Sequence, residues 1–139
     1  MTTMMQPARA GVSWSPERFK AFWSKPGDPW RVMGAVTEDI VGYWPRPVGI
    51  VSGAIPYVGV IEALLVVCPD FSLEVPEVAT NGDLVFLRWI ASGSGPDGVF
   101  RFNGCDRVRL RGGHVCENYV FCDDPFFARV AEALSKRAE

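Results

Sequence analysis

The spacing of hydrophobic residues follows a helical period in the first half of the chain. In the segment SPERFKAFWSK, residues 15–25, three aromatic residues at i, i+3 and i+4 share one face: Phe19, Phe22 and Trp23. Ser15 suits the cap of this helix, and the proline after it suits the first helical position. GDPWRVMGAV, residues 27–36, repeats the arrangement with Asp28 as the cap. The pattern predicts two short helices.

Residues 37–68 carry a strand signal and then a strong helix signal. TEDIVGYWP predicts a short strand that ends at Pro45, followed by a loop rich in proline and glycine. From Ile55 to Cys68 the sequence is apolar on nearly every side, and Pro69 stops the helix that this stretch predicts. A helix without a polar face is typical of a buried or interface position.

The second half alternates with a period of two, as strands do. Asn81-Gly82 and Gly112-Gly113 each separate two alternating segments and predict tight hairpins, and SGPDG predicts a further turn. The last segment, DPFFARVAEALSKR, predicts a closing helix capped by Asp124. Helices followed by a long antiparallel meander predict an α+β fold, in which the meander curls around the early helices as a cone with a pocket inside.

Length and charge add limits to this picture. The chain has 139 residues without a repeat or linker, so we expect one domain over residues 13–139 after a flexible lead-in, residues 1–12. The net charge of -2 and the lack of a Lys/Arg cluster argue against nucleic acid or a membrane as partner. No apolar run reaches the roughly 18 residues that span a bilayer. The N-terminus lacks the features of a signal peptide, and we expect a cytoplasmic protein.

No cofactor or metal ion is expected. The four cysteines show no CxxC spacing, and the only histidine, His114, lies beside a predicted turn, so a zinc site is disfavoured. SGSGPDG is neither a phosphate loop nor a dinucleotide-binding motif, because no helix follows it. Without a well-placed histidine, no Ser-His-Asp set can form.

One carboxylate falls on the apolar side of the predicted meander. The glycine turn pairs Leu110 with Val115, and continuing this register sets Asp106 opposite Tyr119 and places Asn118 on the outer face. Asp106 then shares a face with five apolar or aromatic residues: Phe102, Val108, Val115, Tyr119 and Phe121. An aspartate in such surroundings has a raised pKa unless a cation or hydrogen-bond donors compensate for its lost hydration. It could exchange protons with a substrate or, kept neutral, donate a hydrogen bond to an oxyanion.

Other arrangements of Asp106 stay open from the sequence. Its carboxylate could cap a loop after Gly104 or accept a hydrogen bond from Tyr119, and a bulge at Asn103-Gly104 would turn it to the other face. Arg88 could pair with it across the sheet and lower its pKa. An outer position for Arg88, in a salt bridge or dimer contact, is the preferred alternative.

Three segments carry a family resemblance: PDFSLEV, NGDLVFLRW and GCDRVRLRGGHVCENYVFCDDP. With these segments, and from about Glu17 to Pro125, the chain resembles the SnoaL-like polyketide cyclase branch of the nuclear transport factor 2-like superfamily. The resemblance implies a cone of three N-terminal helices against a strongly curved sheet, usually as a homodimer. It also implies a role for Asp106, which matches the general acid/base of such cyclases and the protonated oxyanion-hole aspartate of ketosteroid isomerases.

Departures from the family patterns narrow the function that the resemblance implies. The separate general base of the isomerases would fall near Trp44, which cannot take a proton, so steroid isomerisation is not expected. The Arg-x-Asp pair of limonene epoxide hydrolases reads Arg88-Trp89-Ile90 here, so their water-activating arrangement is absent. The pocket histidine that cyclases often carry on the middle strands is absent as well.

We predict a small cofactor-free enzyme that acts on an apolar carbonyl-bearing or polycyclic molecule, as a polyketide cyclase or an isomerase does. Asp106 is the predicted proton donor and acceptor, and Tyr119 is predicted to tune it. Five aromatic residues are predicted to line the pocket: Trp44, Tyr57, Trp89, Phe102 and Phe121. The alternatives are a non-catalytic binding or dimerisation module of the same fold, and a hydrolase or dehydratase with a diverged acid/base set.

Overall fold

The computed structural model describes residues 13–138, and the expected flexible lead-in, residues 1–12, lies outside them. The helices are α1 (Pro16–Ser24), the 3-10 helix η2 (Pro29–Ala35), α2 (Ala54–Val67) and α3 (Phe126–Ala138). The strands are β2 (Val36–Tyr43), β3 (Ile50–Ser52), β4 (Ser72–Asn81), β5 (Leu84–Gly95), β6 (Gly98–Arg111) and β7 (His114–Phe121). Within the described residues, no helix combines the length and the hydrophobicity needed to cross a membrane.

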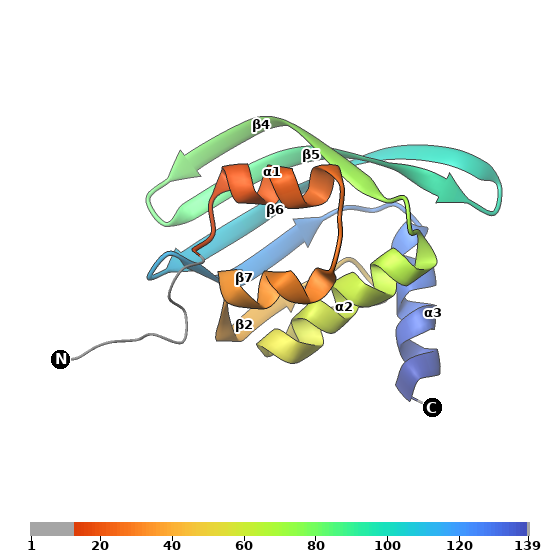
Figure 1. Ribbon diagram of the computed structural model, residues 1–139, viewed down its shortest axis with the longest axis horizontal. Coiled ribbons are helices and arrows are strands. Elements are labelled where there is room, and N and C mark those ends of the chain that lie inside the picture. Colours follow the sequence, from red (N-terminus) through yellow and green to blue (C-terminus); the bar gives the residue numbers. More distant parts are fainter. Residues whose placement is uncertain (1–12, 139) are drawn as a thin grey trace.

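The strands form one curved, unclosed sheet in the order β3-β2-β7-β6-β5-β4 (Figure 1). β4 to β7 are the antiparallel meander that the alternation predicted, and the α+β fold class is confirmed. β2 pairs with β7 in parallel, so the sheet is mixed rather than purely antiparallel. β3 pairs with β2 inside a stretch predicted as a loop, because three residues are too few to show an alternating pattern.

Three helices begin where a side-chain cap was predicted. The Ser15 hydroxyl accepts a hydrogen bond from the amide of Arg18 at 3.1 Å. The carboxylates of Asp28 and Asp124 each accept one from the amide two residues further on, at 3.0 and 2.9 Å. These oxygens satisfy amides that have no partner within the first helical turn, which fixes where each helix starts.

The core lies between the helices and one face of the sheet. In Figure 1, α1, η2 and α2 lie on the same side of the sheet, and α3 lies beside α2. α2 contacts β2, η2 and α3, whereas α1 contacts β4. Seven of the 14 residues of α2 are buried, in agreement with its lack of a polar face. Side chains that are at most 2% exposed fill the core: Ile40, Val58, Ile61, Leu87, Val108 and Val130.

A one-residue bulge interrupts β7. The predicted pair of Leu110 and Val115 is confirmed, but Arg109 pairs with Glu117, which leaves Cys116 as an extra residue. In an unbroken register Glu117 would carry its charge onto the apolar face, which is costly without a partner. With the bulge, the Glu117 carboxylate accepts hydrogen bonds from arginine side chains of β6 instead.

The bulge reverses the faces predicted for the rest of β7. Asp106 pairs with Val120, so the predicted pairing with Tyr119 is wrong. Asn118 was expected on the outer face, but it is 3% exposed and points into the protein. Tyr119 is 38% exposed and Phe121 is 50% exposed, because both now lie on the outer face.

Two glycines on the inner face of the sheet leave room for aromatic rings. A Cβ atom at Gly104 would lie 2.2 Å from the ring of Trp89, the cross-strand partner of this glycine. A Cβ atom at Gly42 would lie 2.7 Å from the ring of Tyr57 on α2. Both distances are well below van der Waals contact, so a side chain at either position displaces a ring.

We expect Gly104→Ala to lower the free energy of unfolding by about 1–3 kcal/mol, because the added methyl group overlaps the ring of Trp89. Urea denaturation measures this change. Gly59→Ala is the matched control, since an added methyl group on α2 has no neighbouring atom within 4 Å there. Its better helix propensity should raise the stability by up to about 1 kcal/mol. A Gly104→Ala protein as stable as the wild type would contradict the close packing of Trp89.

Candidate active site

The helices and the inner face of the sheet surround a cavity of about 530 Å³. Residues of α1, η2 and α2 form one wall, and inward side chains of the strands form the other. Most of the lining is apolar or aromatic, as in pockets that bind small organic molecules. Three polar side chains interrupt this wall where β6, β7 and α2 meet: Tyr57, Asp106 and Asn118.

Asp106 is 7% exposed and lies on β6 with its side chain on the cavity wall. The indole N–H of Trp89 donates to its Oδ1 atom at 2.8 Å, and the side-chain amide of Asn118 donates to its Oδ2 atom at 3.0 Å. Each carboxylate oxygen therefore has one donor and keeps capacity for a further proton. Residues 13–138 contain no cluster of three or more His, Cys, Asp or Glu side chains that could hold a metal ion.

A further hydrogen bond connects Asp106 and Asn118 to helix α2. The Tyr57 hydroxyl donates to the Oδ1 atom of Asn118 at 2.6 Å. Tyr57 lies on α2, Asn118 on β7, Asp106 on β6 and Trp89 on β5, so four elements fix the group. The two inner-face glycines provide the space in which both aromatic rings reach the Asp-Asn pair. The amide of Asn118 uses a donor and an acceptor at the same time, which orients it.

Burial raises the pKa of Asp106 to about 6, and the hydrogen bonds from Trp89 and Asn118 partly counteract the rise. The direction agrees with the raised pKa predicted from the sequence. The pKa of Tyr57 also lies well above its usual range, first because of burial and then because of the nearby charge of Asp106. Asp106 therefore titrates close to neutral pH, while Tyr57 remains a hydrogen-bond donor.

Three of the five predicted pocket aromatics line the cavity: Trp44, Tyr57 and Trp89. Trp44 packs against Tyr57 with ring centroids 5.3 Å apart, and its buried indole N–H has no hydrogen-bond partner among the described residues. Phe102 does not line the cavity, so its predicted role there is wrong. It points inward as expected, but Phe100 and Phe126 cover it with ring centroids 5.6 Å away.

Tyr119 and Phe121 do not reach the cavity. The first was predicted to tune Asp106 and the second to line the pocket, and both placements are wrong because the bulge at Cys116 turns them outward. Their rings stack with centroids 4.7 Å apart, and Tyr119 stacks at the same distance on Tyr43 of β2. These rings form an aromatic strip on the outer face of the sheet.

Arg88 also lies outside the site. Its guanidinium is 2.7 Å from the carboxylate of Glu77, so the outer position is confirmed and the alternative pairing with Asp106 is wrong. Asn118 is the site residue that the sequence reasoning missed. The signal that could have revealed it is Glu117, since an unbroken alternation puts a carboxylate on an apolar face and a bulge avoids this.

Residues 17–118 match the SnoaL-like domain family. A protein of ketosteroid isomerase-like fold from Catenulispora acidiphila, in complex with trimethylamine, is similar with a TM-score of 0.71 and 14% identity, covering 85% of this chain and 95% of the other. A candidate SnoaL-like polyketide cyclase from Jannaschia sp. CCS1 is similar with a TM-score of 0.68 and 19% identity, covering 90% of this chain and 98% of the other. TerC, co-crystallised with polyporic acid, is similar with a TM-score of 0.63 and 17% identity, covering 85% of this chain and 99% of the other. No curated protein matches the chain in sequence. Identities this low show a shared fold.

The buried carboxyl group should make stability depend on pH. Asp106 has a pKa of about 6 in the folded chain against 3.8 for an ordinary aspartate, so the folded state binds more protons between these values. The free energy of unfolding should therefore fall as pH rises from about 4 to about 6, by up to roughly 3 kcal/mol relative to Asp106→Asn.

Urea denaturation across this pH range, with Asp97→Asn as a control in an exposed turn, measures the difference. The control should follow the wild type at every pH. Parallel stability curves for the wild type and Asp106→Asn would show that Asp106 is not desolvated.

Proposed function

This chain belongs to the SnoaL-like domain family, as its resemblance predicted, and from that premise we propose that it is an enzyme of the cyclase or isomerase type. Asp106 transfers protons on an apolar small molecule that bears a carbonyl group. One observation carries the proposal: a desolvated carboxylate with a pKa of about 6 lies on the wall of an apolar cavity. The candidate SnoaL-like polyketide cyclase among the similar structures supports the same reaction class.

The proposed step begins at a carbon next to a carbonyl group. The Asp106 carboxylate takes a proton from this carbon: the C–H bond breaks, an O–H bond forms on the carboxyl group, and the electron pair remains on the substrate as an enolate. The enolate carbon then attacks a second carbonyl of the same molecule and forms a C–C bond. The resulting alkoxide takes the proton back, so Asp106 is regenerated and no cofactor is required.

The pKa of Asp106 favours the role of base over that of neutral donor. With a pKa of about 6, most Asp106 side chains are ionised at pH 7. A carboxyl group that serves an oxyanion hole in the neutral form needs a pKa well above the working pH. Proton abstraction is therefore the better supported of the two chemistries that the sequence left open.

Asn118 and Tyr57 are proposed as positioning residues for this base. When a proton lies between Oδ2 of Asp106 and Asn118, the amide must turn over, because an N–H cannot face an O–H donor. The amide oxygen then accepts from Asp106, and its N–H group donates to the oxygen of Tyr57. This frees the Tyr57 hydroxyl hydrogen to donate into the cavity, where the enolate oxygen develops negative charge.

Two further expectations remain proposals. A homodimer is supported by the aromatic strip of Tyr43, Tyr119 and Phe121, because stacked rings exposed on a sheet face are typical of contact surfaces. A cytoplasmic location is supported by the four cysteines, which are all free. Neither is needed for the proposed chemistry.

The central test uses 2-tetralone, an apolar bicyclic ketone, in D₂O. NMR measures the rate at which the protons on its α-carbon exchange for deuterium. The wild type should accelerate exchange, with a rate that rises with pH and levels off above about 6 as Asp106 loses its proton. Asp106→Asn should lower the enzyme-dependent rate by about 100-fold or more. Asp97→Asn, the same change on an exposed turn, should leave the rate unchanged.

Other outcomes separate the alternatives. Undiminished exchange by Asp106→Asn would remove Asp106 from the mechanism. Binding of 2-tetralone without any exchange by the wild type would favour the non-catalytic binding module. Hydrolysis of styrene oxide without ketone exchange would favour the hydrolase, for which Asn118 is a polar neighbour that could hold a water molecule beside Asp106.

The oligomeric state is tested by light scattering during gel filtration. We expect a dimer for the wild type and a monomer for Tyr119→Lys, because a charge at the centre of the aromatic strip must be desolvated on association. Val99→Lys, at an exposed position of β6 outside the strip, should remain dimeric. A monomeric wild type would contradict this proposal and leave the catalytic one untouched.

A further inference from the structure

The lining of the cavity combines one acid with several bases. Among the described residues that line it, the single acidic side chain is Asp106, and three are basic: Arg18, Lys25 and Arg31. All three basic residues are exposed, so their charged ends lie where the cavity meets solvent. Apart from Tyr57, Asp106 and Asn118, the cavity is thus apolar in its interior, and it is positively charged at its mouth.

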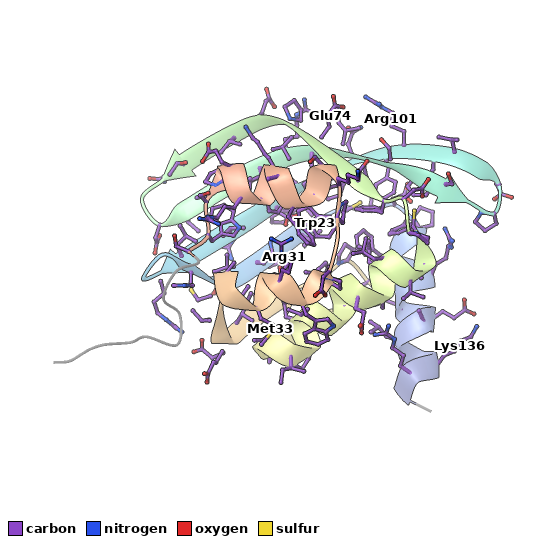
Figure 2. All side chains as sticks on the ribbon, viewed as in Figure 1. Trp23, Arg31, Met33, Glu74, Arg101 and Lys136 are labelled. Carbon is purple, nitrogen blue, oxygen red and sulfur yellow. The ribbon has the colours of Figure 1, made fainter. Side chains whose placement is uncertain are left out.

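The two N-terminal helices bring these charges together. Arg18 lies on α1, and Lys25 is the capping residue directly after the end of this helix, seven positions further along the chain. Arg31 lies on η2, and in Figure 2 its side chain points from η2 toward α1, on the side where Trp23 lies. Trp23 is itself part of the cavity lining. The exposed residues of the lining, these three cations included, all lie between positions 18 and 31, so the cavity meets solvent along the segment that runs from α1 to η2.

Among the described residues, these three cations have no ion-pair partner, in contrast to many other basic side chains of the protein. In the part of the chain that the structure describes, six arginines form ion pairs with carboxylates, but none of these pairs includes Arg18, Lys25 or Arg31. Asp28, which lies between them in sequence, uses its carboxylate to cap η2. The whole chain has a net charge of -2, so an excess of positive charge at the mouth does not reflect its general composition.

We infer that the molecule that enters this cavity carries an anionic group, a carboxylate or a phosphate, which stays at the mouth beside Arg18, Lys25 and Arg31. Its apolar body fills the interior, and its reacting carbonyl lies at the opposite end near Asp106. A positive rim attracts an anion from solution, and the field is concentrated where a cleft has low-dielectric walls. The inference extends the proposed function, since it names the class of substrate on which Asp106 acts.

This arrangement also orients the substrate. The Asp106 carboxylate repels a second anion, so a molecule with a charged end and a neutral carbonyl end binds in one direction only. A neutral ketone such as 2-tetralone can still reach Asp106, although nothing at the mouth fixes its direction. Orientation by the rim would therefore show in binding before it shows in the chemistry.

Calorimetric titration with two ligands of nearly equal shape tests the inference: naphthalene-2-acetate, which is anionic, and naphthalene-2-acetamide, which is neutral. An exposed ion pair corresponds to about a fivefold gain, so the acetate should bind about fivefold more tightly than the amide. This preference should disappear in about 0.5 M sodium chloride, where charges more than a few ångströms apart are screened. 2-Naphthyl phosphate in a third titration shows which anion is preferred.

Arg31→Gln and Lys25→Gln should each reduce the preference for the acetate and leave the affinity for the amide unchanged. Arg101→Gln is the matched control, because this arginine projects from β6 away from the cavity and pairs only loosely with Glu74, at 3.8 Å (Figure 2). Equal binding of acetate and amide by the wild type would overturn the inference. Proton exchange on 2-tetralone is measured separately, so a failure here is distinct from a failure of the catalytic proposal.

Discussion

The hydration that the Asp106 carboxylate loses in the interior is the constraint to which the rest of the site responds. Two N–H groups, from Trp89 and Asn118, replace part of the water that an exposed carboxylate would bind. They are enough to let the charge exist inside the protein but not enough to return its pKa to an ordinary value. A third donor or a nearby arginine would stabilise the anion further and weaken it as a base. The balance of partial solvation makes this side chain chemically useful.

Backbone features that lie outside the hydrogen-bonded group make this balance possible. Gly104 and Gly42 carry no side chain, so the rings of Trp89 and Tyr57 approach the sheet closely enough to donate to Asp106 and Asn118. The apolar helix α2 supplies Tyr57 from a buried position, which keeps water from competing for these bonds. The hydrogen-bonded group therefore depends both on the two glycines of the sheet and on the two aromatic rings that pack against them.

Most of the fold could be predicted from the sequence, because its signals are local. Ser15, Asp28 and Asp124 mark helix starts by their own hydrogen bonds, and glycine-containing turns mark the hairpins. Alternation also predicted the apolar face for Asp106, and the residue is buried there. The hydrogen-bond partner Asn118 could not be predicted, because alternation shows on which face a residue lies but not where a bulge adds an extra residue to a strand. The parallel pairing of β2 with β7 likewise depends on segments far apart in the chain.

The bulge at Cys116 has a consequence for how relatives of this protein are compared. In a homologue without the extra residue, the inward and outward positions of the strand after the turn are shifted by one residue. An ungapped alignment then equates side chains that point to opposite sides of the sheet. A functional role carried over from one sequence to the other is then assigned to the wrong residue, one position away, at every position of the strand after the bulge. A single-residue gap beside the turn restores the correspondence, and an amide two positions after it becomes the feature to seek in other members.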